Sequence, residues 1–407
     1  MPVSSFKILC GVGLLAIFSS TISKSPALPL LVSHLGGGPS AIGLIASISA
    51  CAGILFSFPA GILSDRIGRK RMLVFSAIVF ATAPFCYLLV REIWQLALVR
   101  FYHGLATAIF VPVAMSMVAD LYQQGRGEKM GWFSTATLLG RFVAPAVGGA
   151  LLGITGHGQE TGFHLVYLTC GLAGLVVLPA LLLLPDVKVG HQRGSLPFSA
   201  SVPGTWRDNV GPLLRHRGIM ITCGMEAAIL FAYGIFETFL PVRGVVVGLA
   251  AWQIGLCLSS QVITIALAKP ALGRFSDLHG RPAQILVGAL FGSLCMALLA
   301  IVSSFWSLLV ASILLGLAIS VVTSASAANI ADLSKGGTHG SAMGILGSIM
   351  DLGHTTGPML GGLLAASLGL QASFLSACAM LLAAGVVFYL GYPGDWRVTG
   401  KAFRNTR

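Results

Sequence analysis

Charged side chains are scarce in this 407-residue chain. They make up 9% of it, against about a quarter of an average soluble domain, whereas hydrophobic residues make up 56%. This composition excludes an ordinary soluble protein and indicates a chain that crosses a lipid bilayer many times. The formal net charge of +12 could suggest a nucleic-acid partner, but the positions of the basic residues argue against one, as shown below.

Motifs of soluble enzymes are also missing. There is no Walker loop, no Gly-x-Ser-x-Gly and no His-Glu-x-x-His, and the Gly-x-Gly at 11–13 lies within an apolar segment. We therefore expect no enzymatic activity, no ATP-driven pumping by this chain alone, and no metal or cofactor. The eight cysteines all fall in apolar segments and none forms Cys-x-x-Cys, so we interpret them as small buried hydrophobic residues.

Apolar stretches of about 20 residues predict membrane-spanning helices. We identify twelve, and interpret the first as a retained span rather than a signal peptide because eleven follow it. A polar stretch, 186–216, separates six spans from six. The predicted domains are thus an N-terminal bundle (1–185), a central loop (186–216), a C-terminal bundle (217–391) and a basic tail (392–407). The spans are 8–32, 41–62, 72–90, 94–120, 130–153, 164–185, 217–241, 251–272, 284–303, 306–332, 341–366 and 371–391.

The distribution of lysine and arginine predicts the orientation. If both termini are cytoplasmic, nineteen of these residues lie in cytoplasmic segments and only two, Arg91 and Arg243, in outer loops. The remaining four lie within spans. The basic charge is then explained by the anionic inner leaflet of a cell membrane, without nucleic acid.

The densest charge lies in Gly-Ile-Leu-Ser-Asp-Arg-Ile-Gly-Arg-Lys-Arg, residues 61–71, between the second and third spans. Such a segment must turn tightly on an aqueous side, because each charge is costly in hydrocarbon. We expect Gly61 and Gly68 to let the flanking helices approach closely. A second copy lies in the other half of the chain, where Gly273, Asp277, Gly280 and Arg281 match Gly61, Asp65, Gly68 and Arg69 at one constant shift.

The fifth and eleventh spans share a second repeated pattern, and its shift differs from that of the charged segment by a single position. It reads Gly-x8-Gly-x3-Ala-Pro-x2-Gly-Gly in the first copy and has Gly in place of Ala in the second. Glycine and proline bend membrane helices and permit close packing. General packing by small residues is the alternative interpretation. The residues concerned are Gly140, Pro145, Gly148, Gly149, Gly353, Gly357, Pro358, Gly361 and Gly362.

These motifs and the repeat resemble the major facilitator superfamily along essentially the whole chain, and the Gly/Pro pattern resembles the antiporter motif of its proton-driven drug exporters. The resemblance implies an all-α integral membrane fold of twelve helices in two pseudo-symmetric six-helix bundles. We expect a monomer in the lipid bilayer with a small-molecule substrate. It also implies a cytoplasmic gate, in which Asp65 meets the start of the eleventh helix and Arg69 pairs with Asp120. Asp277, Arg281 and Asp332 are the weaker second copy. The alternative is that these are solvated loop charges.

Ionisable residues within spans are candidates for the transport pathway. Arg100 lies in a segment that resembles the family's fourth-helix motif, where an arginine is implicated in proton coupling; a structural arginine that snorkels to the surface is the alternative. Asp351 and His354 lie on one helix face and form a candidate proton-carrying pair. Arg141, at the repeat position of His354, is a candidate for binding an anionic group or for pairing with Asp351.

Three further residues complete the set. Glu226 and Glu237 are acids within the seventh span, and each has a structural ion pair as its alternative role. The first and seventh helices face each other across the cavity of this family, so Lys24 and Glu237 are expected to form a charge pair across it. A lysine in the first helix, where drug exporters usually carry acids, leaves room for anionic, zwitterionic or amphipathic substrates.

We therefore predict a secondary transporter that works by alternating access, most simply by proton-coupled efflux of a small organic molecule with the proton gradient as the energy source. A proton-coupled or facilitated importer of a nutrient or organic anion is the first alternative. A non-transporting membrane sensor on the same scaffold is more remote, because seven intramembrane charges are retained. An enzyme embedded in the membrane is the most remote, because it would need a clustered nucleophile or metal set.

Overall fold

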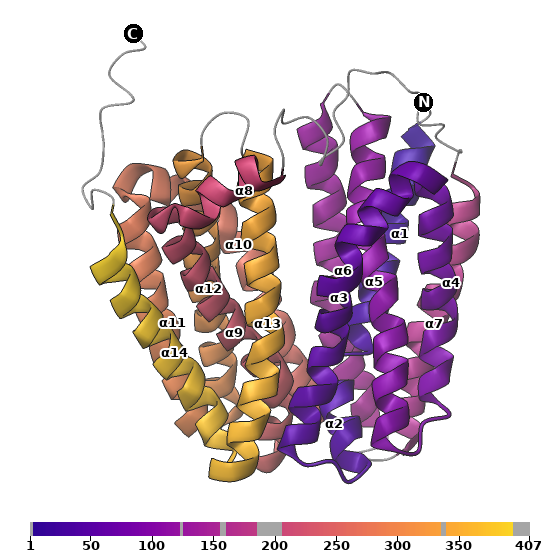
Figure 1. Ribbon diagram of the computed structural model, residues 1–407. Coiled ribbons are helices and arrows are strands. Elements are labelled where there is room, and N and C mark those ends of the chain that lie inside the picture. The colour runs from indigo at the N-terminus through magenta and orange to yellow at the C-terminus, as the bar shows by residue number, and fades with distance from the viewer. Residues whose placement is uncertain (1–2, 123–124, 155–159, 185–205, 335–338, 394–407) are drawn as a thin grey trace.

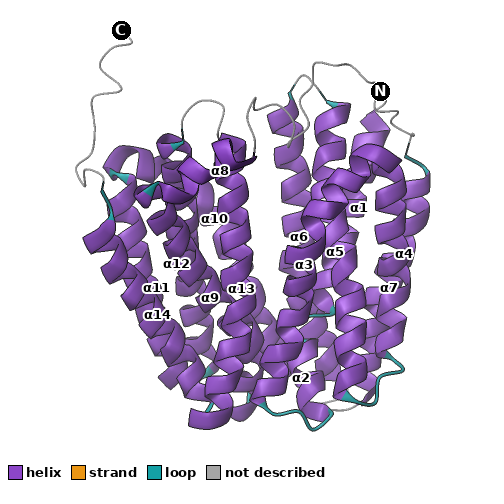
Figure 2. Cartoon of the chain, viewed as in Figure 1, coloured by secondary structure: helices purple, strands orange, loops and turns teal. Residues whose placement is uncertain are grey.

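The structure is a computed structural model that describes residues 3–122, 125–154, 160–184, 206–334 and 339–393. Within these residues every regular element is an α-helix (Figure 2). The first seven helices are α1 (Val3–Ile22), α2 (Ala27–His34), α3 (Pro39–Ile67), α4 (Arg69–Tyr87), α5 (Ile93–Leu121), α6 (Arg126–Ile154) and α7 (Glu160–Leu182). The others are α8 (Trp206–Arg215), α9 (Arg217–Val246), α10 (Ala251–His279), α11 (Arg281–Ile301), α12 (Phe305–Leu333), α13 (His339–Leu368) and α14 (Leu370–Gly391).

The long helices form two bundles that stand side by side, α1–α7 in one and α9–α14 in the other (Figure 1). We call them the N bundle and the C bundle. Helix α1 begins and α14 ends at the same end of the molecule, the upper end in Figure 1, which we call the terminal end. The other end is called the opposite end.

Among the described residues, eleven helical segments are long and apolar enough to cross a membrane by length and composition, with α1 and α2 counted as one segment, Ser5–His34. The twelfth expected span is α13, which extends over 30 residues alongside the others. It is less apolar because it carries Asp351, His354 and many small or hydroxyl side chains. Large apolar side chains such as Val287 and Leu390 are more than half exposed, as expected for surfaces that contact lipid.

Three expectations about the helices need correction. The first span is interrupted between Ile22 and Ala27, because Pro26 has no N–H to continue the hydrogen-bond ladder. The central loop contains a helix, α8, whose Leu213 is buried in a small apolar cluster with Ile219. Helix α9 continues to Val246, so Arg243, expected in a loop, is helical and donates a hydrogen bond to the Val302 carbonyl oxygen at 3.1 Å.

The charged segment after the second span is also largely helical. Only Gly68 separates α3 from α4, and only Gly280 separates α10 from α11. Both have positive φ, +102° and +91°, a conformation that only glycine adopts readily. The expected close approach is absent at Gly61, where an added Cβ would meet nothing within 4 Å. Gly68 also has open space, so backbone conformation explains that glycine.

The two bundles meet along two seams that are copies of each other under the repeat. In one seam, a Cβ on Gly43 of α3 would lie 2.1 Å from the Pro358 carbonyl oxygen of α13. In the other, a Cβ on Gly255 of α10 would lie 2.3 Å from the Pro145 carbonyl oxygen of α6. Under the repeat, Gly255 is the counterpart of Gly43, and Pro358 is the counterpart of Pro145. Glycine in these positions lets the backbones touch.

Two hydrogen bonds reinforce the seams and obey the same repeat. Ser47 of α3 donates to the Thr355 carbonyl oxygen of α13, and Ser259 of α10 donates to the Phe142 carbonyl oxygen of α6, both at 2.8 Å. The seams thus use the N-terminal parts of α3 and of α10, which lie toward the opposite end. The bundles are therefore fastened together in that half of the molecule.

Candidate functional site

The interface between the bundles holds an ion pair. Nζ of Lys24, at the break between α1 and α2, lies 2.6 Å from Oε2 of Glu237 in α9. His354 of α13 places its Nε2 3.2 Å from the same oxygen. The side chains of Lys24 and Glu237 are only 24% and 11% exposed, so the pair is largely screened from solvent. The charge pair expected from the sequence is present, and a histidine joins it.

Aromatic packing holds the histidine of this cluster in place. The rings of Tyr233 and His354 are stacked, with centroids 5.2 Å apart and planes at 12°. The backbone permits this because Gly234, next to Tyr233, lies against α13: a Cβ there would be 2.8 Å from the His354 carbonyl oxygen. The cluster of Lys24, Glu237, His354 and Tyr233 thus draws on both bundles, and we call it the central cluster.

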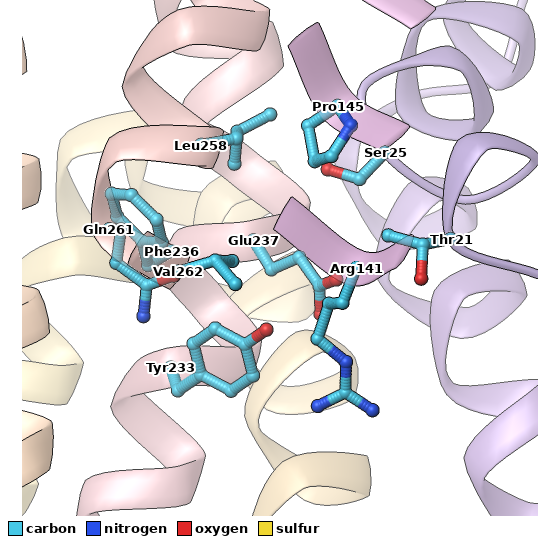
Figure 3. Close-up of a pocket in the computed structure, with 10 residues that line it drawn as sticks. All are labelled: Thr21, Ser25, Arg141, Pro145, Tyr233, Phe236, Glu237, Leu258, Gln261 and Val262. Carbon is cyan, nitrogen blue, oxygen red and sulfur yellow. The ribbon is translucent and has the colours of Figure 1, made fainter. Parts of the chain in front are cut away.

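A small pocket of about 10 Å³ adjoins the central cluster, with room for one water-sized group (Figure 3). Its polar lining residues come from both bundles. Apolar side chains, including Phe236 and Leu258, supply the rest of the wall. The polar lining residues are Thr21, Ser25, Arg141, Tyr233, Glu237 and Gln261.

Asp351 and His354, the candidate proton-carrying pair, make no ion pair or hydrogen bond with each other among the described residues. Nε2 of His354 is directed to Glu237 instead. Asp351 is exposed. Arg141 is also exposed and makes no ion pair or hydrogen bond with any described residue, so its expected pairing with Asp351 is absent too. Neither Asp351 nor Arg141 therefore forms an ion pair with a described residue.

Glu226 occupies a different environment from Glu237, although both lie on α9. Glu226 is 1% exposed and lies inside the C bundle. Its Oε2 atom has no hydrogen-bond partner among the described residues. A buried carboxyl oxygen that lacks a hydrogen-bond partner makes the charged form of the group costly. The structure thus separates Glu226, enclosed within one bundle, from Glu237, which lies at the interface.

Arg100 does not snorkel to the surface. It is 3% exposed, inside the N bundle, and its Nη1 donates to the Tyr87 hydroxyl at 3.3 Å. The Tyr87 ring stacks on Tyr167, with centroids 4.3 Å apart, and His103 lies 3.4 Å from the same hydroxyl. Arg100 therefore belongs to a buried polar cluster within one bundle and lies outside the central cluster.

Near the terminal end, Arg69 bridges two carboxylates of the N bundle. Its Nη2 lies 2.6 Å from Oδ1 of Asp65, and its Nε lies 3.0 Å from Oδ2 of Asp120. The second copy is similar, since Nε of Arg281 lies 2.9 Å from Oδ2 of Asp332. The side chain of Asp277 lies outside the described residues, as do residues 335–338, which immediately precede the expected contact of Asp65 on α13.

The repeated glycines contact neighbouring backbones at several places. An added Cβ would come within 2.5 Å of a carbonyl oxygen at Gly140, Gly149, Gly353 and Gly357. Gly140 faces α1 and Gly149 faces α10, whereas Gly353 and Gly357 face α9. Gly148, Gly361 and Gly362 make further close contacts, so the pattern packs α6 and α13 both within their own bundles and across the seams.

Several residues of the site did not stand out in the sequence. Tyr233, Gln261 and Ser25 line the pocket, and Ser47 and Ser259 bond the seams. Of these, Ser47 and Ser259 could have been singled out from the sequence, because they occupy equivalent positions in the two halves of the repeat. Tyr233 and Gln261 stand among apolar neighbours in sequence, and only the packing of helices shows that they face the same space.

Comparison with known proteins establishes the family. The sequence model of the Major Facilitator Superfamily matches residues 9–255 and 231–404. The chain belongs to this superfamily of membrane transporters, and its members are not enzymes. The predicted fold class is thereby confirmed.

Two individual proteins of known sequence resemble the chain at 30% identity or less. The chain is 30% identical to multidrug resistance protein MdtG of Escherichia fergusonii over 373 residues, covering 88% of this chain and 87% of that protein. It is 24% identical to the MFS-type transporter MJ1560 of Methanocaldococcus jannaschii over 400 residues, covering 95% and 96% of the two chains.

Among solved structures, a bacterial homologue of the human lysosomal transporter Spinster, in an inward-facing and unoccupied conformation, superposes with a TM-score of 0.82 at 16% identity, covering 96% of each chain. A mutant of the nucleoside transporter NupG superposes with a TM-score of 0.79 at 15% identity, covering 95% of this chain and 99% of that one. These likenesses concern the fold alone.

Proposed function

We propose that this transporter exports a small organic molecule across the cell membrane in exchange for protons, by alternating access. The observation that carries the proposal is the central cluster, where Lys24 of one bundle and Glu237 and His354 of the other meet at the interface. Such a cluster can respond both to a proton and to a ligand, because either one alters the charge balance that holds the bundles together.

The distribution of basic residues supports a cytoplasmic terminal end. The sequence assigns nineteen of the 25 lysines and arginines to the predicted cytoplasmic segments, against two in the predicted outer segments. The seams then lie on the extracellular side. We infer that, in this arrangement, a substrate reaches the central cluster from inside the cell.

Asp351 is the proposed proton carrier. It lies within α13, the helix that also carries His354 and the seam residue Thr355, and it forms no ion pair with a described residue. A carboxylate without a fixed cation can take up and release a proton without first breaking a salt bridge. Because α13 contacts the N bundle, a change of charge on Asp351 acts directly on an element that must move.

The direction of transport is supported by two observations. The relatives at about 30% identity include proteins named for multidrug resistance. The Gly/Pro pattern that resembles the antiporter motif is present in α6, and its second copy lies in α13. Because the pattern occurs in both halves, it supports the antiporter class more strongly than it supports one direction.

The test uses purified protein in proteoliposomes that contain a pH-sensitive dye and carry an imposed proton gradient. Candidate substrates of different charge are added one at a time. We expect particular substrates to dissipate the gradient, with substrate moving against the protons. Movement of substrate and protons in the same direction would replace export by import. Substrate flux that leaves the gradient unchanged would show a facilitator, and proton coupling would be wrong.

A further inference from the structure

The pocket beside the central cluster contains hydrogen-bond donors that have no acceptor among the described residues. Gln261 and Ser25 are each 1% exposed. Nε2 of Gln261 and Oγ of Ser25 have no hydrogen-bond partner among the described residues. Arg141 lines the same pocket and, as described above, makes no ion pair or hydrogen bond with a described residue. Buried polar groups are ordinarily satisfied, so the two buried groups left open, Gln261 and Ser25, indicate a missing hydrogen-bond partner, and the exposed guanidinium of Arg141 lines the same space.

The charge balance of the lining points to the same conclusion. Only Arg141 and Glu237 are ionised among the lining residues. The carboxylate of Glu237 is already engaged by Lys24 at 2.6 Å and by His354 at 3.2 Å. The guanidinium of Arg141 is therefore the uncompensated charge of the pocket. An anion placed there would supply the counter-charge.

The repeat explains why the counter-charge is missing. In the C bundle, His354 faces the acid Glu237. The repeat counterparts of these two residues in the N bundle are Arg141, for His354, and Ser25, for Glu237. The N bundle thus has an arginine in place of the histidine and a hydroxyl group in place of the acid. The position that holds the carboxylate of Glu237 in the C bundle therefore has no negative charge in the N bundle.

The close-up shows how the donors are arranged. The guanidinium of Arg141 and the amide nitrogen of Gln261 extend toward the same side of the pocket, and Tyr233 lies between them in this view (Figure 3). The side chains of Phe236, Leu258 and Val262 add an apolar wall. Because the pocket has room for only one water-sized group, it can take a small part of an anionic head, and the body of the ligand would lie outside it, where Arg141 is exposed.

We propose that Arg141 and Gln261 form the subsite for an anionic group of the transported molecule, so that the substrates are organic anions such as carboxylates or phosphonates with an apolar or aromatic body. This inference rests on the proposed transport of a small organic molecule, and it adds the chemical class. Ser25 supplies a further donor when the ligand enters the pocket.

The test measures binding rather than transport. The full-length protein, purified in detergent, is heated in the presence of four probes that share one ring: benzoate, phenylphosphonate, benzamide and benzylamine. Stabilisation against unfolding at increasing probe concentration gives an apparent affinity. We expect the two anions to stabilise the protein, and the neutral and cationic probes to have much weaker effects.

Four variants assign the effect to the subsite. Arg141→Gln and Gln261→Glu should each weaken binding of both anions by at least about tenfold, because one removes the charge and the other opposes the anion. Arg141→Lys keeps the charge without the planar fork and should retain part of the affinity. Lys269→Gln removes another intramembrane cation, one that does not line the pocket, and should bind the anions as the unmodified protein does.

Several outcomes would overturn the proposal: stabilisation by neither anion, equal or stronger stabilisation by benzylamine, or unchanged anion affinity in folded Arg141→Gln protein. Because no proton gradient is present, the result is independent of the proteoliposome experiment. Arg141-dependent binding of anions together with an absence of proton flux would retain this subsite and reject proton coupling. The reverse result would retain coupled transport and reject an anionic substrate.

Discussion

Lys24 and Glu237 are joined across the interface of the two bundles, with Nζ 2.6 Å from Oε2, and they come from opposite halves of the chain. Both side chains are mostly buried. A charge left there without its partner is costly, so the pair links the arrangement of the bundles to the protonation and occupancy of the site.

The first prediction concerns this ion pair. Lys24→Gln and Glu237→Gln should each destabilise the protein by about 2 kcal/mol, because each leaves one largely buried charge uncompensated. The double variant should be more stable than the sum of the single effects implies, since it removes both charges. Thermal unfolding in detergent measures all three. Strictly additive losses would show that the two groups do not interact.

The second prediction concerns proton coupling. Asp351→Asn should abolish substrate-dependent dissipation of a proton gradient while leaving thermal stability nearly unchanged, because the carboxylate is exposed and unpaired among the described residues. Glu128→Gln, which removes an exposed acid near the terminal end, is the matched control and should transport normally. Normal coupling in folded Asp351→Asn protein would exclude Asp351 as the proton carrier.

The third prediction concerns the seams. Gly43→Ala places a methyl group 2.1 Å from the Pro358 carbonyl oxygen, and Gly255→Ala places one 2.3 Å from that of Pro145. Either substitution should force the seams apart at a cost of about 1–3 kcal/mol and favour the state open at the opposite end. Gly53→Ala, on the same helix as Gly43 with nothing within 4 Å of the added Cβ, is the control.

Distances between spin labels at the opposite ends of α3 and α13 would measure that shift. We expect longer distances in Gly43→Ala and Gly255→Ala than in the unmodified protein, and unchanged distances in Gly53→Ala. Identical distance distributions in all four proteins would show that the close glycine contacts do not determine which state is populated.

The fourth prediction concerns the network near the terminal end. Asp65→Asn removes one of the two carboxylates that bind Arg69, and should lower turnover with little effect on substrate binding if this segment is a gate. Asp332→Asn, in the second copy, should have a smaller effect, because basic residues of the first copy are replaced there by Leu278 and Pro282. Transport rates and binding affinities measured together would separate the two effects. Unchanged turnover in Asp65→Asn would remove the gating role.

The fifth prediction distinguishes two glycines of the same segment. Gly68→Ala should destabilise the protein by about 1–2 kcal/mol, because φ at this position is +102° and an L side chain is strained there. Gly61→Ala should be nearly neutral or slightly stabilising, because it is helical and its added Cβ has open space. Thermal unfolding compares them, and equal effects would contradict the conformational explanation.

Much of the fold could be predicted from the sequence, because the bilayer imposes helices of about 20 apolar residues and the two halves repeat their motifs. Lys24 and Glu237 could be paired because the first and seventh helices face each other in the family that the sequence resembles. The break at Pro26 and the helix α8 were missed, because a span with one proline and a polar linker each permit more than one local structure.

Side-chain partners within the membrane were harder to predict. Asp351 and His354 share a helix face, yet His354 turns to Glu237, because the stacking of Tyr233 and the close approach of α9 direct its ring. Arg100 looked able to reach the surface from its position along the helix, yet Tyr87 holds its guanidinium inside the bundle. Such preferences arise from contacts between helices that are distant in sequence, and periodicity along one helix does not contain them.

The matching seams have a consequence for the symmetry of the chain. Contact of Gly43 with Pro358 and contact of Gly255 with Pro145 are the same contact, seen once from each half. Consider a polypeptide of half this length that pairs with an identical copy about a two-fold axis. It would form both seams at once, because in such a dimer each contact occurs twice, once from each copy. The interface therefore has the form of the isologous contact of a symmetric dimer, held within one chain.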